Sequence, residues 1–275
     1  MRFGPAFLWL LLPIIGLLLG LVTGISTLVQ HAFTGPEGPS LGNVSEFIGR
    51  PEVLSVFLYT HKIALIVTII CVAIAYPLAV FMALRPHIVY LILIIMPLLI
   101  SIVVRTYGWI VILGPRGLVN TLLIEFGIIE RPLRLMFNTG GVVLGLVHVF
   151  IPFAVLTILA VYVKIDRSLS EAATALGANP WKTFTKIVLP LSIPGVMTAA
   201  TIVYLLSLGA IVTPLLMGGV RDAMIGTMIY NQMLVFFNYP EASAAAFVLT
   251  LSAAIAVIPF QAVDYWVTRK MPRAT

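Results

Sequence analysis

The chain has 275 residues, of which 61% are hydrophobic and 9% are charged, and its mean hydropathy is +1.12. Soluble domains are roughly a quarter charged, and a soluble chain this apolar would expose large hydrophobic patches and aggregate. The composition therefore excludes an ordinary soluble domain and predicts an integral membrane protein. The net charge of +6 is scattered between apolar segments without a basic run, so we attribute it to membrane topology and expect no nucleic-acid partner.

The apolar segments are long and continuous, which predicts spanning helices rather than the alternating strands of a membrane barrel. A spanning helix needs about 20 mostly apolar residues. Six segments meet this need, at about 6–28, 60–84, 88–104, 138–163, 193–217 and 243–265. The first exceeds the ~7–15 apolar residues of a signal peptide, so we expect an uncleaved helix. The predicted fold class is all-α: a polytopic membrane bundle of six transmembrane helices, in a single domain over residues 1–275.

Small residues recur every four positions in two of these segments, at Gly16, Gly20 and Gly24 and at Gly141 and Gly145. This spacing lets helix backbones approach closely in a membrane. It fits either a contact between two chains or ordinary packing within one bundle.

The charges predict an orientation. With the N-terminus in the cytoplasm, nine basic residues and three acids fall on the inner side, against seven of each on the outer side. The inner basic residues are Arg2, Arg85, Lys164, Arg167, Lys182, Lys186, Arg269, Lys270 and Arg273. The positive excess then lies inside, as the positive-inside rule expects, and both termini are cytoplasmic.

The loop between the fourth and fifth spans, residues 166–190, is the most informative segment. Ser168 followed by Glu171 has the spacing of a capping box, which predicts a short helix from about Leu169. Gly177 is suited to end this helix. One stripe of it is apolar and consists of Leu169, Ala172, Ala173 and Leu176.

A second short helix is predicted after the first, because Asn179 is a good N-cap and Pro180 a good first residue. We expect it to run toward Leu189 and to end at Pro190, before the fifth span. The two helices would lie across the cytoplasmic face. Their alanine-rich stripe fits insertion into a groove of another protein, and it equally fits a surface helix resting on its own bundle.

A family resemblance favours the first interpretation. The signature positions are Glu171, Ala172, Ala173, Gly177, Ile187, Leu189 and Pro190, with three residues between Ala173 and Gly177 and nine between Gly177 and Ile187. This pattern resembles the EAA loop of permease subunits in ABC importers at every signature position. In that family the loop is a coupling helix that sits in a cleft of the ATPase subunit.

The resemblance implies roles for these residues. Ala172, Ala173 and Leu176 would pack in the ATPase cleft, Gly177 would form the turn, and Glu171 would cap the helix and pair with a basic group. It also implies the fold of a type I ABC importer permease, in the lipid of the bacterial cytoplasmic (inner) membrane. The implied partners are an ABC ATPase subunit dimer, a second homologous permease subunit and an extracytoplasmic solute-binding protein.

Three further regions resemble spermidine/putrescine-type permeases. They are Arg105–Ile110 with Gly117–Asn120, Pro214–Gly219 with Ile225–Ile229 and Gln232, and Asn238–Ser243. A polyamine is therefore the expected solute. Related permeases for ferric iron, thiosulfate, phosphonates and amino-acid derivatives share much of this pattern, so those solutes remain alternatives.

Sequence motifs of catalysis are missing. The chain has no GxxxxGK[S/T] and no HExxH motif, its four histidines are widely separated, and Cys71, its single cysteine, lies in an apolar run. We therefore expect no enzymatic activity, no cofactor and no metal site, and we expect ATP hydrolysis on a separate subunit.

Six residues are candidates for the substrate path: His148, Lys62, Arg105, Tyr107, Trp109 and Gln232. Ionisable groups at membrane depth are costly and often functional. Most of them have a plainer alternative: His148 fits a hydrogen bond to a neighbouring helix, and Lys62 with His61 fits a contact with the headgroups. Arg105 either anchors its helix or guides the docking protein, while Tyr107 and Trp109 fit a short interfacial helix.

The predicted spans contain no deep acidic residue, and Asp264 is expected at the membrane interface. The polyamine assignment therefore rests on resemblance. An ion-coupled secondary transporter is a rival, but it would need midplane carboxylates and an inverted repeat, and the sequence shows neither. A membrane protein with a purely structural role is a second rival, and it would have no need of the complete coupling motif.

Overall fold

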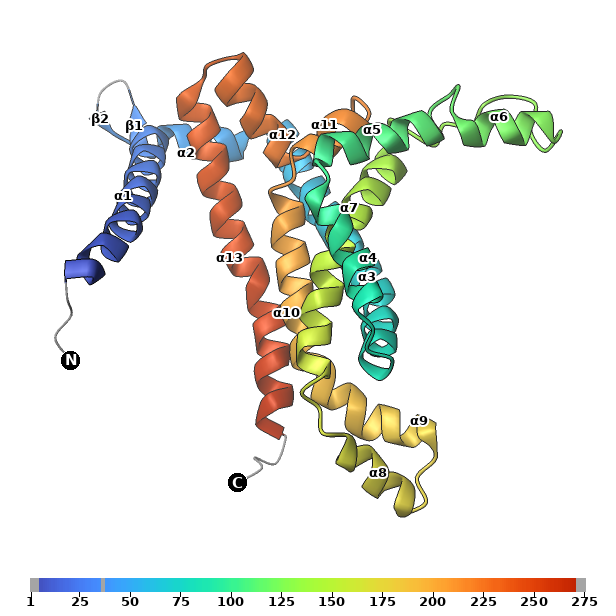
Figure 1. Ribbon diagram of the computed structural model, residues 1–275. Helices are drawn as coiled ribbons and strands as arrows, with labels where there is room; N and C mark the ends of the chain where they lie inside the picture. The colour runs from blue at the N-terminus through green and yellow to red at the C-terminus, as the bar shows by residue number, and fades with distance from the viewer. Residues whose placement is uncertain (1–4, 36–37, 271–275) are drawn as a thin grey trace. The chain divides into compact units, whose positions relative to one another are not determined.

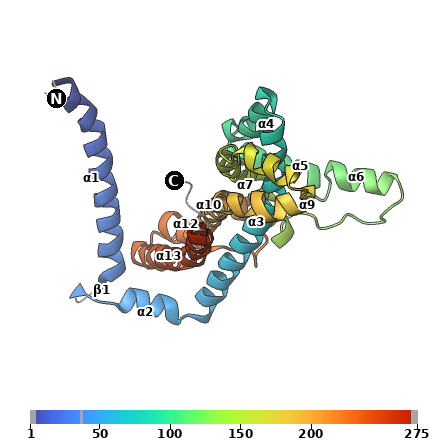
Figure 2. The same ribbon diagram turned by 90° about the horizontal axis from the view of Figure 1, so that it is seen from below.

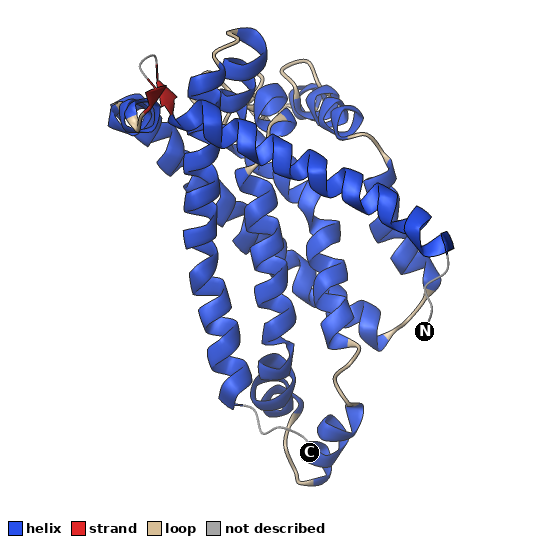
Figure 3. Ribbon diagram, turned by 90° about the vertical axis from the view of Figure 1, so that its left-hand side faces the viewer, coloured by secondary structure: helices blue, strands red, loops and turns tan. Residues whose placement is uncertain are grey.

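The structure is a computed structural model that describes residues 5–35 and 38–270. Arg2 and Arg273, which entered the charge count, lie outside the described residues. Apart from one pair of two-residue strands, the regular elements of the described chain are helices (Figure 3). The described residues contain six helical segments long and apolar enough to cross a membrane. The all-α fold with six spans is thus confirmed.

The chain divides into two compact units, residues 1–55 with 228–251 and residues 56–227 with 252–275. The first unit contains α1 (Pro5–Phe33), β1 (Thr34–Gly35), β2 (Gly38–Pro39), α2 (Gly42–Gly49) and η2 (Asn231–Val235). The second contains α4 (Ile88–Leu99), α5 (Ile102–Leu113), α6 (Leu118–Glu125), α7 (Thr139–Tyr162), α8 (Arg167–Ala175), α9 (Pro180–Thr183), η1 (Phe184–Val188), α10 (Leu189–Leu208) and α11 (Val212–Met217). Three helices have residues in both units: α3 (Pro51–Leu84), α12 (Ile225–Tyr230) and α13 (Tyr239–Lys270).

The first unit is held together by long-range side-chain contacts. Arg50 donates to Glu241 with an Nη1–Oε1 distance of 2.8 Å, which ties the segment between α2 and α3 to the first turn of α13. The rings of Phe33 and Phe247 meet edge to face with centroids 4.8 Å apart. These contacts fix the end of α1 and the start of α13 within this unit.

The core of the second unit is formed by α3, α7 and α10. Along α3 the buried residues recur every three or four positions, so that they form one stripe of the helix: Ile63, Val67, Cys71, Ala75 and Ala79. They pack with a buried set from α7 and α10 that includes Leu146, Val155, Ile158, Ala199 and Val203. Cys71 is a buried part of this core.

Gly145 explains the close approach of α11 to α7. A Cβ atom at this position would lie 2.5 Å from Met217 Sδ and 2.6 Å from Thr213 Cγ2, both on α11. The small residue is therefore required by packing within the unit, which is the plainer of the two interpretations of its spacing.

The third predicted span, 88–104, is divided between two helices. Pro97 removes one backbone donor from the last turn of α4, and Ile100 and Ser101 are extended, with ψ of 134° and 136°. A hydropathy profile averages over neighbouring residues, so it does not reveal such a break in the helix. The third segment of spanning length and composition is Ile102–Glu125, formed by α5 and α6.

The predicted helix end at Pro190 is wrong, because α9, η1 and α10 form one continuous helical segment, Pro180–Leu208. The π-helical turn Phe184–Val188 lies two residues before Pro190, which has no N–H to donate. In this turn the Leu189 N–H bonds to the Phe184 carbonyl five residues back. The predicted fifth span, 193–217, is instead interrupted after Leu208, and α11 is a separate short helix.

The second unit has two distinct ends. Figure 1 shows α5 and α6 extending sideways from one end of α7, while α8 and α9 lie at the other end. Seen from below in Figure 2, α9 extends sideways from α10. The loop 166–190 is therefore presented at one end of the core helices, away from α5 and α6.

Candidate functional site

The first helix of the loop 166–190 is α8, and it begins earlier than predicted. The Asp166 carboxylate accepts a hydrogen bond from the Ser168 N–H at 2.9 Å, so Asp166 is the N-cap and the predicted capping box of Ser168 and Glu171 is wrong. This hydrogen bond lowers the pKa of the Asp166 carboxyl. Glu171, freed from a capping role, lies exposed on α8.

The end of α8 agrees with the prediction. Gly177 has a φ of +83°, the left-handed conformation that glycine adopts without penalty. The Gly177 N–H bonds to Thr174 O at 2.9 Å and the Ala178 N–H bonds to Ala173 O at 3.0 Å. This pair of bonds is a Schellman motif, which stops the helix and turns the chain sharply.

The second helix also starts as predicted. Asn179 Oδ1 accepts from the Lys182 N–H at 2.7 Å, and Pro180 is the first helical residue. Ile187, Leu189 and Pro190, the last three signature residues, are half-buried in η1 and the start of α10. They therefore lie between the turn at Gly177 and the helical core of the second unit.

Large apolar side chains are exposed on this loop. Leu176 is 89% exposed and Trp181 is 72% exposed, while Ala172 lies exposed on the same face of α8 as Leu176. Large apolar side chains exposed at the turn between α8 and α9 favour contact with another molecule. Trp181 was not among the predicted site residues. Its position beside the N-cap Asn179 was the only available signal.

The loop is also fastened to α3, which sequence reasoning missed. Arg167 Nη2 donates to the Ala83 carbonyl in the last turn of α3 at 3.1 Å. Both residues line a hollow of about 420 Å³ that Glu171 and Val188 also border. A displacement of α8 would therefore act directly on α3, and through η1 on α10.

Three of the six predicted path residues come together at the opposite end of the second unit. Trp109 Nε1 of α5 donates to His148 Nδ1 of α7 at 3.1 Å, with the ring planes nearly perpendicular. Because the indole N–H can only donate, Nδ1 of His148 must carry no proton. Beside them, Nε and Nη1 of Arg105 are buried without a hydrogen-bond partner among the described residues. His148 thus makes the hydrogen bond to a neighbouring helix that was its plainer alternative, and its place in the substrate path stays a prediction.

The other three path candidates lie elsewhere. Tyr107 is 64% exposed on α5. Lys62 lines a separate hollow of about 510 Å³ with His61, Tyr204 and Phe260. Gln232 lies in η2 of the first unit.

Asp222 organises the end of the second unit that carries α5 and α6. Its carboxylate accepts from Tyr59 at 2.7 Å, from Thr139 at 2.5 Å and from the Gly219 N–H at 2.9 Å. Burial by itself would raise the pKa of the Asp222 carboxyl, but the hydrogen bonds from Thr139, Tyr59 and Gly219 outweigh it and lower the pKa. Tyr59 and Thr139 are far from Asp222 in sequence, so no local signal predicted the cluster.

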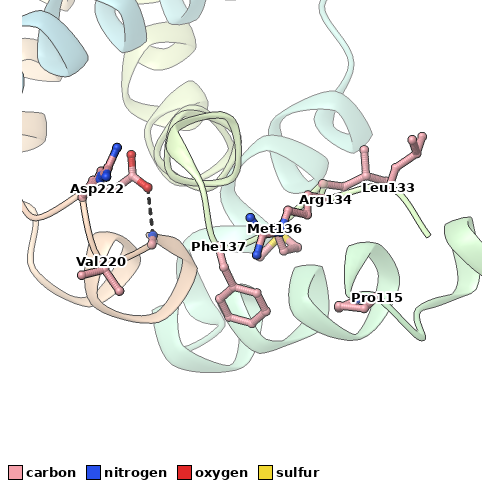
Figure 4. A pocket seen from close by; sticks show the side chains of 10 residues that line it. Pro115, Leu133, Arg134, Met136, Phe137, Val220 and Asp222 are labelled. Atoms are coloured by element: carbon pink, nitrogen blue, oxygen red, sulfur yellow. Dashed lines mark hydrogen bonds between the residues drawn. The ribbon is translucent and has the colours of Figure 1, made fainter. Parts of the chain in front are cut away.

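Next to Asp222 lies a hollow of about 600 Å³ between the segments 133–137 and 219–222. Figure 4 shows Phe137 projecting between Val220 and Pro115 at its edge, with the dashed bond from Gly219 to Asp222 behind. Arg134 and Arg221 also line it, and Val220 is fully exposed. This rim offers apolar contact and positive charge.

Comparison with known proteins identifies the chain's relatives. Residues 5–273 match the family described as binding-protein-dependent transport system inner membrane component. The chain is 34% identical over 219 residues to the spermidine/putrescine transport system permease protein PotB of Escherichia coli K12, covering 78% of each chain. It is also 34% identical over 210 residues to PotB of Haemophilus influenzae, covering 75% of this chain and 73% of that protein.

A solved structure shares the fold. A chain in the crystal structure of a bacterial ABC transporter involved in the import of alginate superposes with a TM-score of 0.70, at 20% identity and with 96% of both chains covered. The six apolar segments and the sequence relatives together establish a multi-pass inner-membrane protein. The chain belongs to the family of inner-membrane components of binding-protein-dependent transport systems, as a PotB-like permease of an ABC importer.

Proposed function

We propose that this permease imports a polyamine and that α8 is its coupling helix to an ABC ATPase dimer. The observation that supports coupling is the exposure of Leu176, at the end of α8, and of Trp181, in α9. Hydrogen bonds fix the start of α8 and the turn after it, and α9 continues into α10. Ala172 and Ala173 would allow close approach in the ATPase cleft, with Leu176 as the anchor. Exposed Glu171 would pair with a basic group of the ATPase.

Coupling would then work by rigid-body motion. Closure of the ATPase dimer on ATP would move α8, and the Arg167–Ala83 bond and the half-buried η1 would pass this movement to α3 and α10. ATP hydrolysis would belong to the ATPase subunits. In this assignment the α8 end of the bundle and both termini are cytoplasmic, in agreement with the excess of basic residues on that side.

The proposed solute follows from the relatives named as spermidine/putrescine permeases. A solute-binding protein would deliver it to the end of the bundle with α5, α6 and the hollow beside Asp222. A second homologous permease subunit would complete the path. Ferric iron, thiosulfate, phosphonates and amino-acid derivatives remain the alternative solutes.

Docking is tested by co-purification of the tagged permease with its ATPase. We expect Leu176→Asp and Gly177→Asp to lose the ATPase, because a buried leucine anchor contributes about 1.5–3 kcal/mol, equivalent to roughly 10–100-fold in affinity. Gly127→Asp is the matched control, since Gly127 also has a positive φ (+65°) but ends α6, remote from α8. Equal retention of the ATPase by all variants would show that α8 is not the docking element.

The solute is tested by uptake of radiolabelled spermidine and putrescine into cells that carry the complete importer. We expect saturable, ATP-dependent uptake of at least one of the two, which unlabelled polyamine competes away and an excess of phosphonate or thiosulfate does not. Uptake that only an anionic solute reduces would contradict the polyamine assignment while leaving the importer assignment intact.

A further inference from the structure

The loop 166–190 contacts α3 at a second point, besides the bond from Arg167 to the Ala83 carbonyl. This contact is made by Tyr76 of α3, whose ring centroid lies 6.2 Å from that of Phe184, the first residue of η1. Ala83 follows Tyr76 by about two helical turns, so both points lie on one side of α3. The beginning and the end of the loop thus contact the same side of the last turns of α3.

The Tyr76 hydroxyl also forms a hydrogen bond. It lies 2.9 Å from Ser192 Oγ, in the first turn of α10. Ser192 Oγ in turn donates to the Leu189 carbonyl at 2.9 Å, which uses its only proton. The Tyr76 hydroxyl must therefore be the donor in its bond to Ser192. Ser192 is buried, so solvent has little access to this acceptor if the tyrosine hydroxyl is removed.

Leu189 connects this hydrogen bond to the π-helical turn. Its N–H donates to the Phe184 carbonyl, and its own carbonyl accepts from Ser192. Phe184 is therefore linked to Tyr76 twice, by its ring directly and by its carbonyl through Leu189 and Ser192. Single π-helical turns within α-helices are uncommon and frequently lie at functional sites. Here the turn is bound to α3 at the point where the loop enters α10.

On its other side, Phe184 packs against Trp181, which lies three residues earlier on the same face of the helix. The two ring centroids are 6.0 Å apart, within the range of attractive aromatic pairs. Trp181 is exposed, whereas Phe184 and Tyr76 are half-buried. The three rings therefore form a continuous aromatic row from the surface of the loop to α3.

Two points of contact constrain α3 more than one point does. With the bond at Ala83 alone, α3 could tilt about that point when α8 moves. The contact at Tyr76 lies about 10 Å further along the helix and opposes this tilt. Movement of the loop would then displace α3 and α10 together, as one rigid body.

We propose that Trp181, Phe184 and Tyr76 are positioning residues that pass movement of the docked ATPase to α3, as a second connection parallel to the bond from Arg167. Trp181 contacts the ATPase, Phe184 carries the displacement through the π-helical turn, and the bond from Tyr76 to Ser192 makes α3 and α10 move together. None of the three aromatic residues is a signature position of the EAA loop. The proposal deepens the proposed coupling function and rests on it for the identity of the partner.

The first experiment compares Tyr76→Phe with wild type in proteoliposomes that contain the complete importer. This variant keeps the ring beside Phe184 and removes the hydroxyl that donates to Ser192. We expect roughly 2–10-fold less transport for each ATP hydrolysed, as for the loss of one neutral hydrogen bond, with co-purification of the ATPase unchanged. Ser192→Ala should lower the ratio similarly, and combining the two changes should lower it no further. Transport is followed with radiolabelled spermidine, or with the solute that the uptake experiment identifies.

Tyr90→Phe is the matched control. Tyr90 is also half-buried, and its ring also packs against a phenylalanine, Phe81 of α3, with centroids 5.3 Å apart. It belongs to α4 and not to the loop, so its variant should keep the wild-type ratio of transport to hydrolysis. A ratio that falls equally in Tyr76→Phe and Tyr90→Phe, or in neither of them, would overturn the proposal.

The second experiment tests whether the three rings act as one connection. Trp181→Ala and Phe184→Leu should each lower transport per ATP in complexes that retain the ATPase. Combined with Tyr76→Phe, either change should cost less than the product of the two single effects, because both interrupt the same row. Combined with Arg167→Ala, Tyr76→Phe should lower the ratio at least by that product. Independent effects within the row would overturn the proposal.

These results are distinguishable from failure of the proposed function. A wild-type permease that neither retains the ATPase nor couples its hydrolysis to transport would refute the coupling function, and this inference with it. A wild-type permease that couples normally, with Tyr76→Phe equal to it, would refute only the connection through Tyr76.

Discussion

At the residue scale, Asp222 joins three parts of the second unit that are remote in sequence. Its carboxylate receives hydrogen bonds from Tyr59 on α3, Thr139 at the first position of α7 and the backbone of Gly219 after α11. Charged acceptors form hydrogen bonds roughly twice as strong as neutral ones. The cluster therefore holds the loops around the hollow with Phe137 and Val220 in one arrangement.

The lowered pKa of Asp222 predicts a pH-dependent stability. A carboxyl whose pKa is lower in the folded than in the unfolded state stabilises the fold at pH values above its unfolded pKa, and this stabilisation disappears as pH falls through the folded pKa. We expect Asp222→Asn to lower the free energy of unfolding by about 1–3 kcal/mol at pH 7. The difference from wild type should shrink below about pH 4.

Thermal unfolding of the purified protein at a series of pH values measures this effect. Tyr59→Phe is the graded control, since it removes one of the three donors and should cost less than Asp222→Asn. If Asp222→Asn were equally destabilising at pH 3.5 and pH 7, the carboxylate charge would not be the source of the stability.

At the element scale, local signals predicted the turn at Gly177, the N-cap at Asn179 and the number of spans, but not the N-cap of α8 or where helices break. Gly177 and Asn179 stabilise the backbone within three or four residues of their own positions, so their roles could be predicted from the local sequence. The break at Ile100 and the continuity through Pro190 depend on backbone conformations that hydropathy does not register. The N-cap of α8 was also missed, because Asp166 and Ser168 are both suited to an N-cap and lie two positions apart.

Contacts between distant helices were also outside the reach of sequence. Arg105, Trp109 and His148 were each proposed for the path, but nothing indicated that Trp109 would donate to His148. The two residues are 39 positions apart, and their meeting depends on how α5 lies across the end of α7.

At the scale of the whole molecule, the second unit connects its two ends through a small number of elements. The loop 166–190 contacts α3 through Arg167 and continues into α10 through η1, and these helices form the core with α7. At the other end, α3 and α7 supply Tyr59 and Thr139 to Asp222. The core helices thus link the loop 166–190 to the end of the unit that carries the Asp222 cluster.

This arrangement predicts that Arg167 couples ATP hydrolysis to transport. Its guanidinium bonds to the Ala83 carbonyl at the end of α3, so Arg167→Ala should leave ATPase binding intact but let α8 move without α3. A hydrogen bond from a charged group contributes about 1.5–3 kcal/mol, so we expect at least roughly tenfold less transport for each ATP hydrolysed. Lys164→Ala removes a nearby exposed positive charge and is the control. Both rates are measured in proteoliposomes that contain the complete importer, and a transport-to-hydrolysis ratio equal in the two variants would place the coupling in η1 and α10 alone.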